Sequence, residues 1–569
     1  MRRPKIEILL FALAWTSYGY FHQGGGWNQN VRFALTRALV ESRQPWIDDY
    51  FVYARKDDQG SAALRRIPVR NGCFTDGGRV YAISWHEAGK DLTPIAADSP
   101  PDARRVASDF VGVSGDLAFA YGHLHPNKAP GASFAAVPGY AVVFNLERRL
   151  GIDPDDAWVL TVNAWLACVL SVGLVAALGV VVFWRLAMKL SGNRTGAALF
   201  ATFTFAFATL YFPYATMQMD HDLVAVALLA AFLLAFDTAS PRRLFAAGIC
   251  AAGSIVASYL SVVAAVILGG YIVWRAGRAR RASGLVAFVA GAIPPLALLA
   301  AYNVACFGNL MAMNYAWENP LFKRAGGSLL ELFTAPRGHV LLALLVSPMR
   351  GLFSGTPVLV LGVIGLVIML RSPRLRPEGL VCVAMIGHVL VFNMSFGNWN
   401  SGWACGPRYL VPALPFLALP VALVPARANW VRHGLLAISI IAMALVTIVD
   451  PQPPPTMVGI WNHSPIWSID LPQWLHGRPG TYATSHWPEE MLSMYVEPVS
   501  SNPDGVYSGA PGRFFPLGSA QTRWNSFNVG EFLFAGRRLS VLPWLALVTV
   551  FAALLRRESA RPARNQRAV

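Results

Sequence analysis

The chain has 569 residues, of which 55% are hydrophobic and only 14% are charged, and its formal net charge is +16. A water-soluble globule of this composition would expose very large apolar patches, so the composition excludes an ordinary soluble protein and favours a polytopic membrane protein. The basic residues stand in short clusters beside hydrophobic runs, which is typical of cytoplasmic membrane loops and argues against a nucleic-acid partner.

The chain begins with MRRPKIEILLFALAWTSYGYF, a basic start followed by an apolar run. No small-residue cleavage site follows this run, so we expect an uncleaved first transmembrane helix. Taking about 20 residues as the spanning length, we expect membrane runs near the following positions: 6–22, 157–184, 196–213, 222–238, 244–274, 283–303, 352–370, 379–396, 409–425, 434–449 and 539–555.

Basic clusters between these runs mark the loops that stay inside the cell. The run 244–274 carries such clusters at both ends and is 31 residues long, so we expect a hairpin of two short helices that turns near Ser258 and Tyr259. About twelve crossings then place both termini in the cytoplasm. An even number of crossings requires 132–150 and 338–349 to lie at the outer interface rather than to cross the membrane.

The predicted fold class is therefore an all-α polytopic protein of the plasma (inner) membrane. Its expected parts are a first transmembrane helix (1–22), an outer loop with interfacial helices (23–156), a transmembrane core (157–449), an outer soluble domain (450–538) and a last transmembrane helix with a cytoplasmic tail (539–569). Six cysteines lack CxxC spacing and indicate no redox centre. Cys73 and Cys405 would share an oxidising compartment, where they could form a disulfide.

The predicted spans are nearly free of charge, and the unusual polar residues lie on the outer side. This asymmetry favours an enzyme that works at the outer interface over a transporter, whose ionisable residues usually lie near mid-membrane. In the first loop, Asp48 and Asp49 stand beside aromatic residues. Either carboxylate could act as a general base; the alternative is that it caps a helix or pairs with an arginine.

Two further positions suit a lipid phosphate. Lys128 in NKAPGASFAAVPGY precedes the predicted interfacial helix, so its ammonium could contact a phosphate at headgroup depth or simply anchor the loop. His221 lies in MQMDHD at the outer mouth of a span. It could contact the donor phosphate, bind a divalent metal together with a loop carboxylate, or cap the helix, but adjacent helical residues point in different directions and cannot easily chelate one ion.

Two later strings, SPMRGLF and NWNSGWACGPRYL, each place an arginine at an outer edge, Arg350 and Arg408. A guanidinium fork matches the oxygens of a phosphate, and we favour phosphate binding over anchoring for Arg408. Trp399 and Trp403 beside Arg408 could stack on a sugar ring or belong to the aromatic belt of the membrane.

The order of these parts resembles the GT-C superfamily of polyprenyl-phosphate-sugar-dependent glycosyltransferases, in particular the bacterial branch near the protein mannosyltransferases and the lipid A aminoarabinose transferases. The strings that carry the resemblance are NVRFALTRALVE, NKAPGASFAAVPGY, MQMDHD, LLVSPMRGLFSGTPVL, NWNSGWACGPRYLVPALPFL and NVGEFLFAGRRLSVLPW. The resemblance implies a substrate-binding arginine at Arg32. It also implies a catalytic acid directly after the first span, where this chain has Asn28, Gln29 and Asn30 instead.

The acid therefore stays open among Asp49, Asp116 and Asp48. The resemblance implies an inverting enzyme of the outer membrane face, which moves a sugar from a polyprenyl-phosphate donor to a glycan, lipid or protein acceptor. The resemblance implies no certain cofactor. The divalent metal considered above for His221 stays an open alternative. Two alternatives remain: a lipid or polysaccharide flippase, and a non-catalytic assembly protein that lost its acid.

Overall fold

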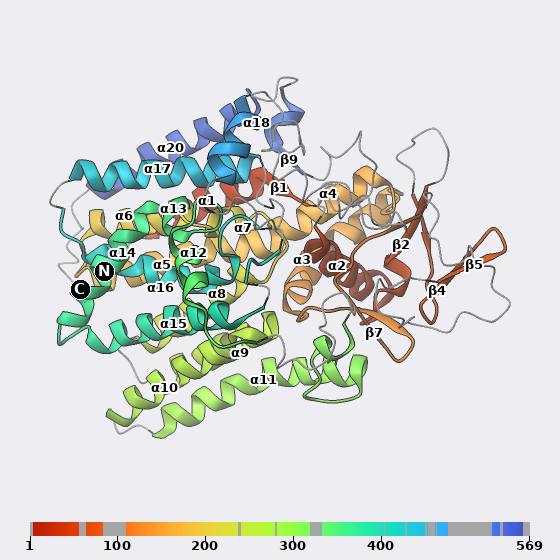
Figure 1. The fold of residues 1–569 in the computed structure, drawn as a ribbon, viewed down its shortest axis with the longest axis horizontal. Helices are drawn as coiled ribbons and strands as arrows, with labels where there is room; N and C mark the ends of the chain where they lie inside the picture. The colour runs from red at the N-terminus through yellow and green to blue at the C-terminus, as the bar shows by residue number, and fades with distance from the viewer. Residues whose placement is uncertain are drawn as a thin grey trace.

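The computed structural model describes residues 4–24, 26–55, 64–82, 110–236, 240–278, 282–318, 333–397, 399–402, 404–426, 429–449, 452, 461, 464–475, 526–534 and 539–560. Figure 1 shows long helices lying side by side along the longest axis, with most of the strands gathered at one end beside α2 and α3. We call that end the outer region. Most of the predicted outer domain 450–538 lies outside the described residues.

Across the described ranges, six helical segments are long and apolar enough to cross a membrane: Trp158–Leu190, Tyr259–Arg278, Ala282–Phe307, Arg376–Ser395, Asn429–Ile448 and Leu539–Ala560. Shorter apolar helices accompany them at Thr195–Phe207, His221–Ala235, Pro357–Arg371 and Arg408–Leu423. The chain is thus a predominantly helical, polytopic membrane protein, as its composition predicts.

The helices of the bundle have the following bounds: α1 (Pro4–Tyr20), α4 (Ala157–Cys168), α5 (Leu174–Leu190), α6 (Thr195–Phe207), α7 (Tyr211–Tyr214), α8 (His221–Ala235), α9 (Pro241–Ala257), α10 (Val262–Arg278), α11 (Ala282–Phe307), α12 (Gly338–Val346), α13 (Leu352–Gly355), α14 (Val360–Arg371), α15 (Arg376–Ser395), α16 (Leu414–Ala418), α17 (Asn429–Ile448), α18 (Leu471–Leu475) and α20 (Leu542–Ala560).

The predicted break in 244–274 is confirmed, because α9 ends and the next helical segment begins at Ser258, whose backbone is extended (φ −153°, ψ 123°). Helix α9 packs closely on α11. A Cβ on Gly248 would meet the carbonyl oxygen of Phe288, and one on Gly291 would meet that of Phe245. Only glycine permits this approach of two helical backbones, which is the usual means of helix association in a membrane.

The span predicted at 409–425 is broken into three short helices, namely η10 (Arg408–Ala413), α16 and η11 (Leu419–Leu423). The physical reason is its prolines, Pro412, Pro415 and Pro420. Each removes a backbone donor and clashes with the preceding turn, so the segment changes between α and 3₁₀ geometry.

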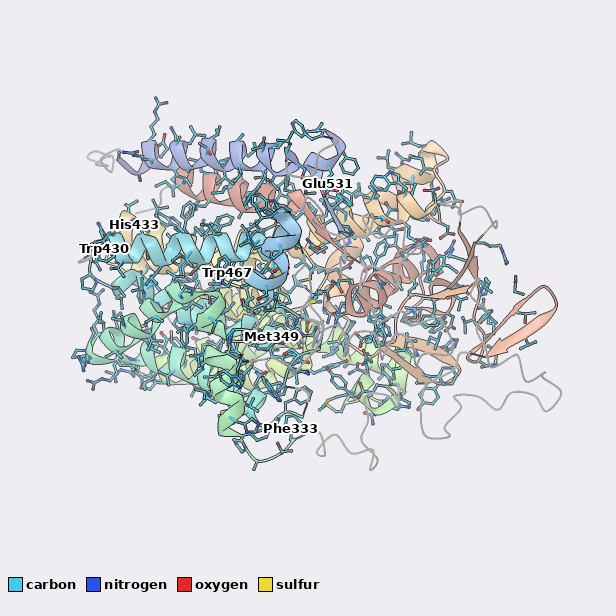
Figure 2. The ribbon with its side chains drawn as sticks, turned by 45° about the horizontal axis from the view of Figure 1, so that its top comes forward. Phe333, Met349, Trp430, His433, Trp467 and Glu531 are labelled. Carbon is cyan, nitrogen blue, oxygen red and sulfur yellow. The ribbon has the colours of Figure 1, made fainter. Side chains whose placement is uncertain are left out.

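Helices α1 and α20 run antiparallel. The Tyr20 hydroxyl at the end of α1 donates to the carbonyl of Ser540 at 2.5 Å, and β1 (Phe21–Gln23) pairs with β9 (Ser526–Asn528) just before α20. The first and last described residues therefore lie at the same end of the bundle. Arg185 pairs with Glu7 there, and Figure 2 shows Trp430 and His433 at that end of α17.

The outer region combines two helices with short sheets, and these strands were not predicted. Its elements are α2 (Trp27–Arg37), α3 (Gly131–Leu150), a sheet of β3 (Leu64–Ile67), β2 (Val52–Arg55) and β6 (Phe110–Gly112), the pair β4 (Cys73–Asp76) and β5 (Arg79–Ala82), and the hairpin β7 (Leu117–Ala120) and β8 (His123–Pro126). Helix α3 exposes one apolar stripe, Val142, Leu146 and Leu150, which suits the interfacial position predicted for 132–150.

Candidate active site

Helix α2 carries Arg32 into the interior, where its side chain is almost fully buried. The Nη2 atom of Arg32 donates to Oδ1 of Asp220 at 2.9 Å. The Nε and Nη1 atoms are also buried and have no hydrogen-bond partner among the described residues. Buried guanidinium donors are normally satisfied, so these two N–H groups indicate a place for an additional acceptor.

Asp220 immediately precedes α8 and joins two distant segments. Besides Arg32, it accepts a hydrogen bond from Ser258 at the break between α9 and α10. The Nδ1 atom of His221 lies 3.9 Å from the same carboxylate oxygen. The charges of Arg32, Lys128 and Arg408 all act on this imidazole, so the first residue of α8 lies where three outer segments converge.

Asp222 points away from this convergence. Its carboxylate is buried, and neither oxygen has a hydrogen-bond partner among the described residues. Asp220 and His221 thus share one environment, whereas Asp222 lies in another. In the described part of the chain, no three His, Cys, Asp or Glu side chains lie close enough to hold a metal ion, and His221 therefore has no set of metal ligands there.

The hairpin β7–β8 brings Asp116 and Lys128 together at its base. Strand pairing places Leu117 opposite Pro126, and the amide of Asn127 donates to the carbonyl of Asp116 at 3.1 Å. The Lys128 Nζ atom then lies 3.4 Å from Oδ1 of Asp116. This pair is formed by two residues that flank the hairpin, so the hairpin register brings their backbones close together.

Asn314 holds the base of the hairpin from the far side. Its Nδ2 atom donates to the carbonyls of Pro126 at 2.7 Å and of Lys128 at 3.0 Å. Its Oδ1 atom accepts from the Tyr259 hydroxyl at 2.8 Å. One buried amide thus ties the backbone on both sides of Asn127 to the turn between α9 and α10, which fixes the direction in which the Lys128 side chain leaves.

Arg408 begins η10 and completes the group. Its guanidinium interacts electrostatically with Asp116 and with His221, and it lies 5.4 Å from the ring centre of Tyr409. Its buried Nε has no hydrogen-bond partner among the described residues. We call the six side chains that meet here the outer ion cluster: Arg32, Asp116, Lys128, Asp220, His221 and Arg408.

The outer ion cluster has the chemistry of an anion site. It contains three permanent cations, and three of their guanidinium N–H-bearing atoms are buried without a partner in the described ranges. An uncompensated buried donor costs about 1–3 kcal/mol, more when it is charged. A phosphate oxygen that accepts from these groups would remove that cost, because guanidinium groups bind phosphate in two-point fashion.

The other two acidic candidates lie elsewhere. Asp48 contacts the tip of the hairpin, where its carboxylate accepts from the Leu124 amide at 2.7 Å and lies 2.6 Å from Nδ1 of His123. Asp49 pairs with the exposed Arg70 at 2.6 Å. Because a strand rises about 3.3 Å per residue, the tip lies roughly 10 Å from the base. The structure therefore brings Asp116 to the cluster and leaves Asp48 and Asp49 outside it.

Arg350 and Trp399 support the neighbouring loop. Arg350 is buried and donates to the backbone carbonyls of Gly402 and Ala404, which holds the chain that leads to Arg408. Trp399 is buried against the bundle core. Trp403 lies outside the described residues. No disulfide joins Cys73 to Cys405 in the part of the chain that the structure describes.

The string Asn28, Gln29 and Asn30, which replaces the expected acid, supplies structural amides. Asn30 Nδ2 donates to the carbonyl of Val113 at 2.9 Å, and Gln29 Nε2 donates to Oε1 of Gln452 at 2.9 Å. These contacts fasten the start of α2 to the segment that leads to Asp116 and to the end of α17. The carboxylate that lies beside Lys128 is therefore Asp116, which precedes the hairpin, and does not come from α2.

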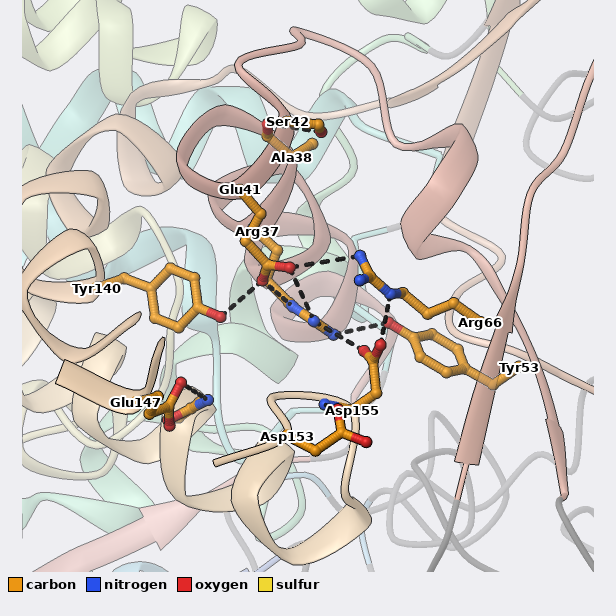
Figure 3. A network of polar contacts seen from close by, with 11 residues as sticks. Arg37, Ala38, Glu41, Ser42, Tyr53, Arg66, Tyr140, Glu147, Asp153 and Asp155 are labelled. Atoms are coloured by element: carbon orange, nitrogen blue, oxygen red, sulfur yellow. Dashed lines mark hydrogen bonds and ion pairs between the residues drawn. The ribbon is translucent and has the colours of Figure 1, made fainter. Parts of the chain in front are cut away.

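A second ionic network fixes the other end of α2 and is shown in Figure 3. Arg37 donates to Glu41 at 2.6 Å, to Asp155 at 2.8 Å and to the Tyr53 hydroxyl at 2.9 Å. Arg66 on β3 donates to the same Asp155 at 2.6 Å. Every charge in this network is paired, so it leaves no vacant position for a ligand and serves to hold α2 against the sheet.

Comparisons with known proteins give a distant structural likeness. No family model matches the chain, and no curated protein matches it. Among the solved structures that overlap with it are ArnT from Cupriavidus metallidurans bound to undecaprenyl phosphate (16% identity, TM-score 0.43, 97% of this chain and 76% of that chain) and the same protein in the apo state (15%, 0.41, 97% and 77%). Likeness at this level assigns neither a family nor an activity.

Sequence reasoning did not assign roles to Asp220, Asn314 or Tyr409. Asp220 in MQMDHD is a charged residue beside an apolar span, and such a residue is itself an indication of a functional site. Asn314 gave no signal, because it acts through backbone contacts to a hairpin that was not predicted. Tyr409 follows Arg408 directly, and only the short η10 turn brings its ring near His221, at 6.2 Å between centroids.

Proposed function

We propose that the chain is an inverting glycosyltransferase that takes a sugar from a polyprenyl-phosphate donor at the outer membrane face. The observation that carries the proposal is the outer ion cluster, where Lys128, Arg32 and Arg408 converge with buried, unpartnered guanidinium donors. A lipid-linked sugar phosphate presents its anionic group at headgroup depth, and the order of sequence parts described above resembles enzymes that use such donors.

The proposed chemistry assigns one role to each group. Asp116 accepts the proton of the acceptor hydroxyl, whose oxygen attacks the anomeric carbon. The bond from that carbon to the phosphate oxygen breaks, and polyprenyl phosphate leaves with its bonding electrons. Lys128 and Arg408 stabilise the charge that builds on this phosphate. Attack from the face opposite the leaving group inverts the anomeric configuration.

Asp116 is preferred over Asp48 and Asp49 because it alone lies at the base of the hairpin beside Lys128. Asp220 already accepts from both Arg32 and Ser258, so its role in the proposal is to orient Arg32. His221 contributes a ring close to the phosphate position. A divalent metal is not part of the proposed step.

The test uses purified full-length protein in lipid nanodiscs with polyprenyl-phosphate-linked sugars and a panel of candidate acceptors. Released polyprenyl phosphate is measured by mass spectrometry. We expect Lys128→Ala and Arg408→Ala each to lower turnover at least a hundredfold, since removing one such stabilising donor costs about that much. Arg70→Ala, which removes an exposed cation at the far side of the hairpin, serves as the matched control and should keep near-normal turnover.

Turnover that is unaffected by both substitutions would remove the phosphate site from the proposal. A flippase would move the labelled lipid across the bilayer without releasing polyprenyl phosphate. A non-catalytic assembly protein would bind the lipid and give no product with any donor and acceptor pair. Protein from the same purification, assayed for lipid movement in sealed liposomes and for product in nanodiscs, separates these three outcomes.

A further inference from the structure

Two arginines lie close together at the end of the helical bundle that is farthest from the outer ion cluster. Helix α17 runs toward the outer region, where Gln452 beyond its end contacts α2. Its first turn, which carries Arg432, therefore lies at the opposite end, where Figure 2 shows Trp430 and His433. Helix α6 packs against α17, and Arg194 directly precedes α6. We call Arg194 and Arg432 the far arginine pair.

The Arg432 side chain is enclosed by the protein and held in one place. The residue is only 6% exposed. Its guanidinium carbon lies 4.4 Å from the ring centre of Phe200 on α6, and the ring of His433 packs edge-on against the same phenyl ring, at 5.6 Å between centroids. An arginine that merely anchors a helix end keeps its head group in water. Arg432 is instead fixed between two helices.

Arg432 has no counter-charge in the described part of the chain. Its Nε atom is buried there without a hydrogen-bond partner. Arg194 is the only charged side chain of the described residues that acts on it electrostatically, and this charge has the same sign. Arg194 Nε donates to the carbonyl of Ser191 at 2.9 Å. A buried charged donor without an acceptor and two neighbouring like charges are both unfavourable, and a bound anion would offset both costs.

The backbone around the far arginine pair also favours an anion. Helix α6 begins at Thr195, directly after Arg194, and no side chain caps it. Arg432 is the fourth residue of α17, and neither helix has an Asp or Glu in its first turn. The N-terminus of a helix carries a partial positive charge and free N–H groups, so it attracts anions and disfavours cations. Two arginines at two such ends therefore reinforce one positive field.

The depth of the pair in the membrane identifies which anion is available. Trp430 in the same first turn is 81% exposed, and tryptophan is enriched at the level of the lipid headgroups. The helix Asn429–Ile448 has 20 residues and is apolar enough to cross the membrane, so its first turn lies where the hydrocarbon ends. The anionic group that a membrane presents at this depth is the phosphate of its lipids.

We infer that the far arginine pair binds the phosphate group of an anionic phospholipid, in the leaflet on the side of the membrane away from the outer ion cluster. The Arg432 guanidinium presents its N–H groups to two phosphate oxygens in two-point fashion, and Arg194 supplies the second positive charge. The site shares no residue with the proposed transferase site and does not depend on it. Inorganic phosphate offers the same oxygens, so the experiment includes it as a separate probe.

The inference is tested by lipid binding, without turnover, on the full-length protein in detergent. Phosphatidylglycerol is titrated into the protein, and native mass spectrometry measures the number and the dissociation constant of the bound lipids. Arg432→Gln removes the guanidinium and should weaken one phosphatidylglycerol site at least tenfold. Arg194→Gln should weaken the same site, because it removes the second charge.

The matched control is Arg374→Gln. This exposed arginine lies in the turn before α15, and α15 ends beside Phe396, whose ring packs on Tyr409 near the outer ion cluster, so Arg374 lies at the same end as the far arginine pair. The control should bind phosphatidylglycerol like the unmodified protein, and thermal melting establishes that each variant is folded. The inference is overturned if folded Arg432→Gln and Arg194→Gln proteins bind as tightly as the unmodified chain, or if Arg374→Gln weakens binding as much as they do.

Two further probes separate the lipid from its parts. Diacylglycerol lacks the phosphate and should not occupy the site; binding as tight as that of phosphatidylglycerol would overturn the inference. Inorganic phosphate that raises the melting temperature of a protein to which phosphatidylglycerol does not bind would assign the site to the free ion and overturn the lipid inference. Lys128→Ala acts at the other end of the bundle and should keep the phosphatidylglycerol site, so the lipid site and the proposed transferase reaction can fail independently.

Discussion

The two ends of the β7–β8 hairpin hold carboxylates in opposite situations. At the tip, Asp48 is buried with one oxygen on a backbone amide and the other beside His123. At the base, Asp116 meets Lys128 at 3.4 Å and interacts with Arg408. Asp116 directly precedes the hairpin, whereas Asp48 belongs to a much earlier segment that packs on the tip. Among the described residues, the base faces cations whose buried donors have no partner. The comparison separates a structural acid from a candidate base.

The largest effect is expected from Asp116→Asn. The amide keeps the size of the side chain but cannot accept the proton of the acceptor, so kcat should fall about 10²- to 10⁴-fold, the usual contribution of a positioned general base. The measurement is release of polyprenyl phosphate under saturating donor. Asp49→Asn at the exposed ion pair with Arg70 is the control and should change kcat less than twofold. If both variants lose kcat to the same extent, Asp116 is no longer distinguished from Asp49 as the catalytic base.

A smaller effect is expected from Asn314→Ala, which removes both hydrogen bonds to the hairpin base. The Lys128 backbone then loses its anchor, and a displaced catalytic group costs rate even when its chemistry is intact. We expect kcat to fall about tenfold and the melting temperature to fall as well, because two buried carbonyls lose their donor. Asn314→Asp keeps the oxygen that accepts from Tyr259 but replaces the donor by a second acceptor, so it should be at least as impaired as the alanine variant; a fully active Asn314→Asp protein would argue against the anchoring role.

The smallest expected effect is on folding stability. It concerns His125 on β8, which lies between the tip and the base of the hairpin. Burial lowers the pKa of His125 from 6.5 to about 4, so the unfolded chain binds a proton between these values that the folded chain does not. Folding stability from this group is therefore complete above pH 6.5 and is lost as the pH falls, by roughly 2 kcal/mol at pH 5.

His125→Phe removes this titration. The melting temperature of the unmodified protein should drop more between pH 7 and pH 5 than that of the variant, as measured by differential scanning fluorimetry in one detergent. Asp48 works in the opposite sense, because burial raises its pKa and its neutral form is favoured by folding. Equal drops in the two proteins would mean that the His125 ring is charged in the folded state.

The helical bundle could be predicted because the hydrophobic runs that form it are a property of local composition. Apolar runs of spanning length and the basic clusters beside them depend on sequence neighbours only, and so does the break at Ser258, which two flanking basic clusters required. The breaks in 408–423 have an equally local cause in Pro412, Pro415 and Pro420, since each proline removes a backbone donor, but they were not predicted, because 409–425 was expected to form one span. The strands of the outer region are only three or four residues long, and no periodicity over so few residues predicts their pairing.

The candidate site also combines residues that the sequence could name with a choice among acids that depends on the tertiary structure. Lys128, His221 and Arg408 stood out by residue type and by their position beside apolar segments, and Arg32 was named from the family resemblance. The choice of Asp116 over Asp48 and Asp49 was left open, because it depends on hairpin register, on Asn314 at the base, and on the ion pair that joins Arg32 to Asp220 across 188 positions. Sequence by itself determined a membrane bundle with cations at its outer end. The tertiary structure alone decided which acid meets them, because ionic contacts act over a few ångströms of space and not along the chain.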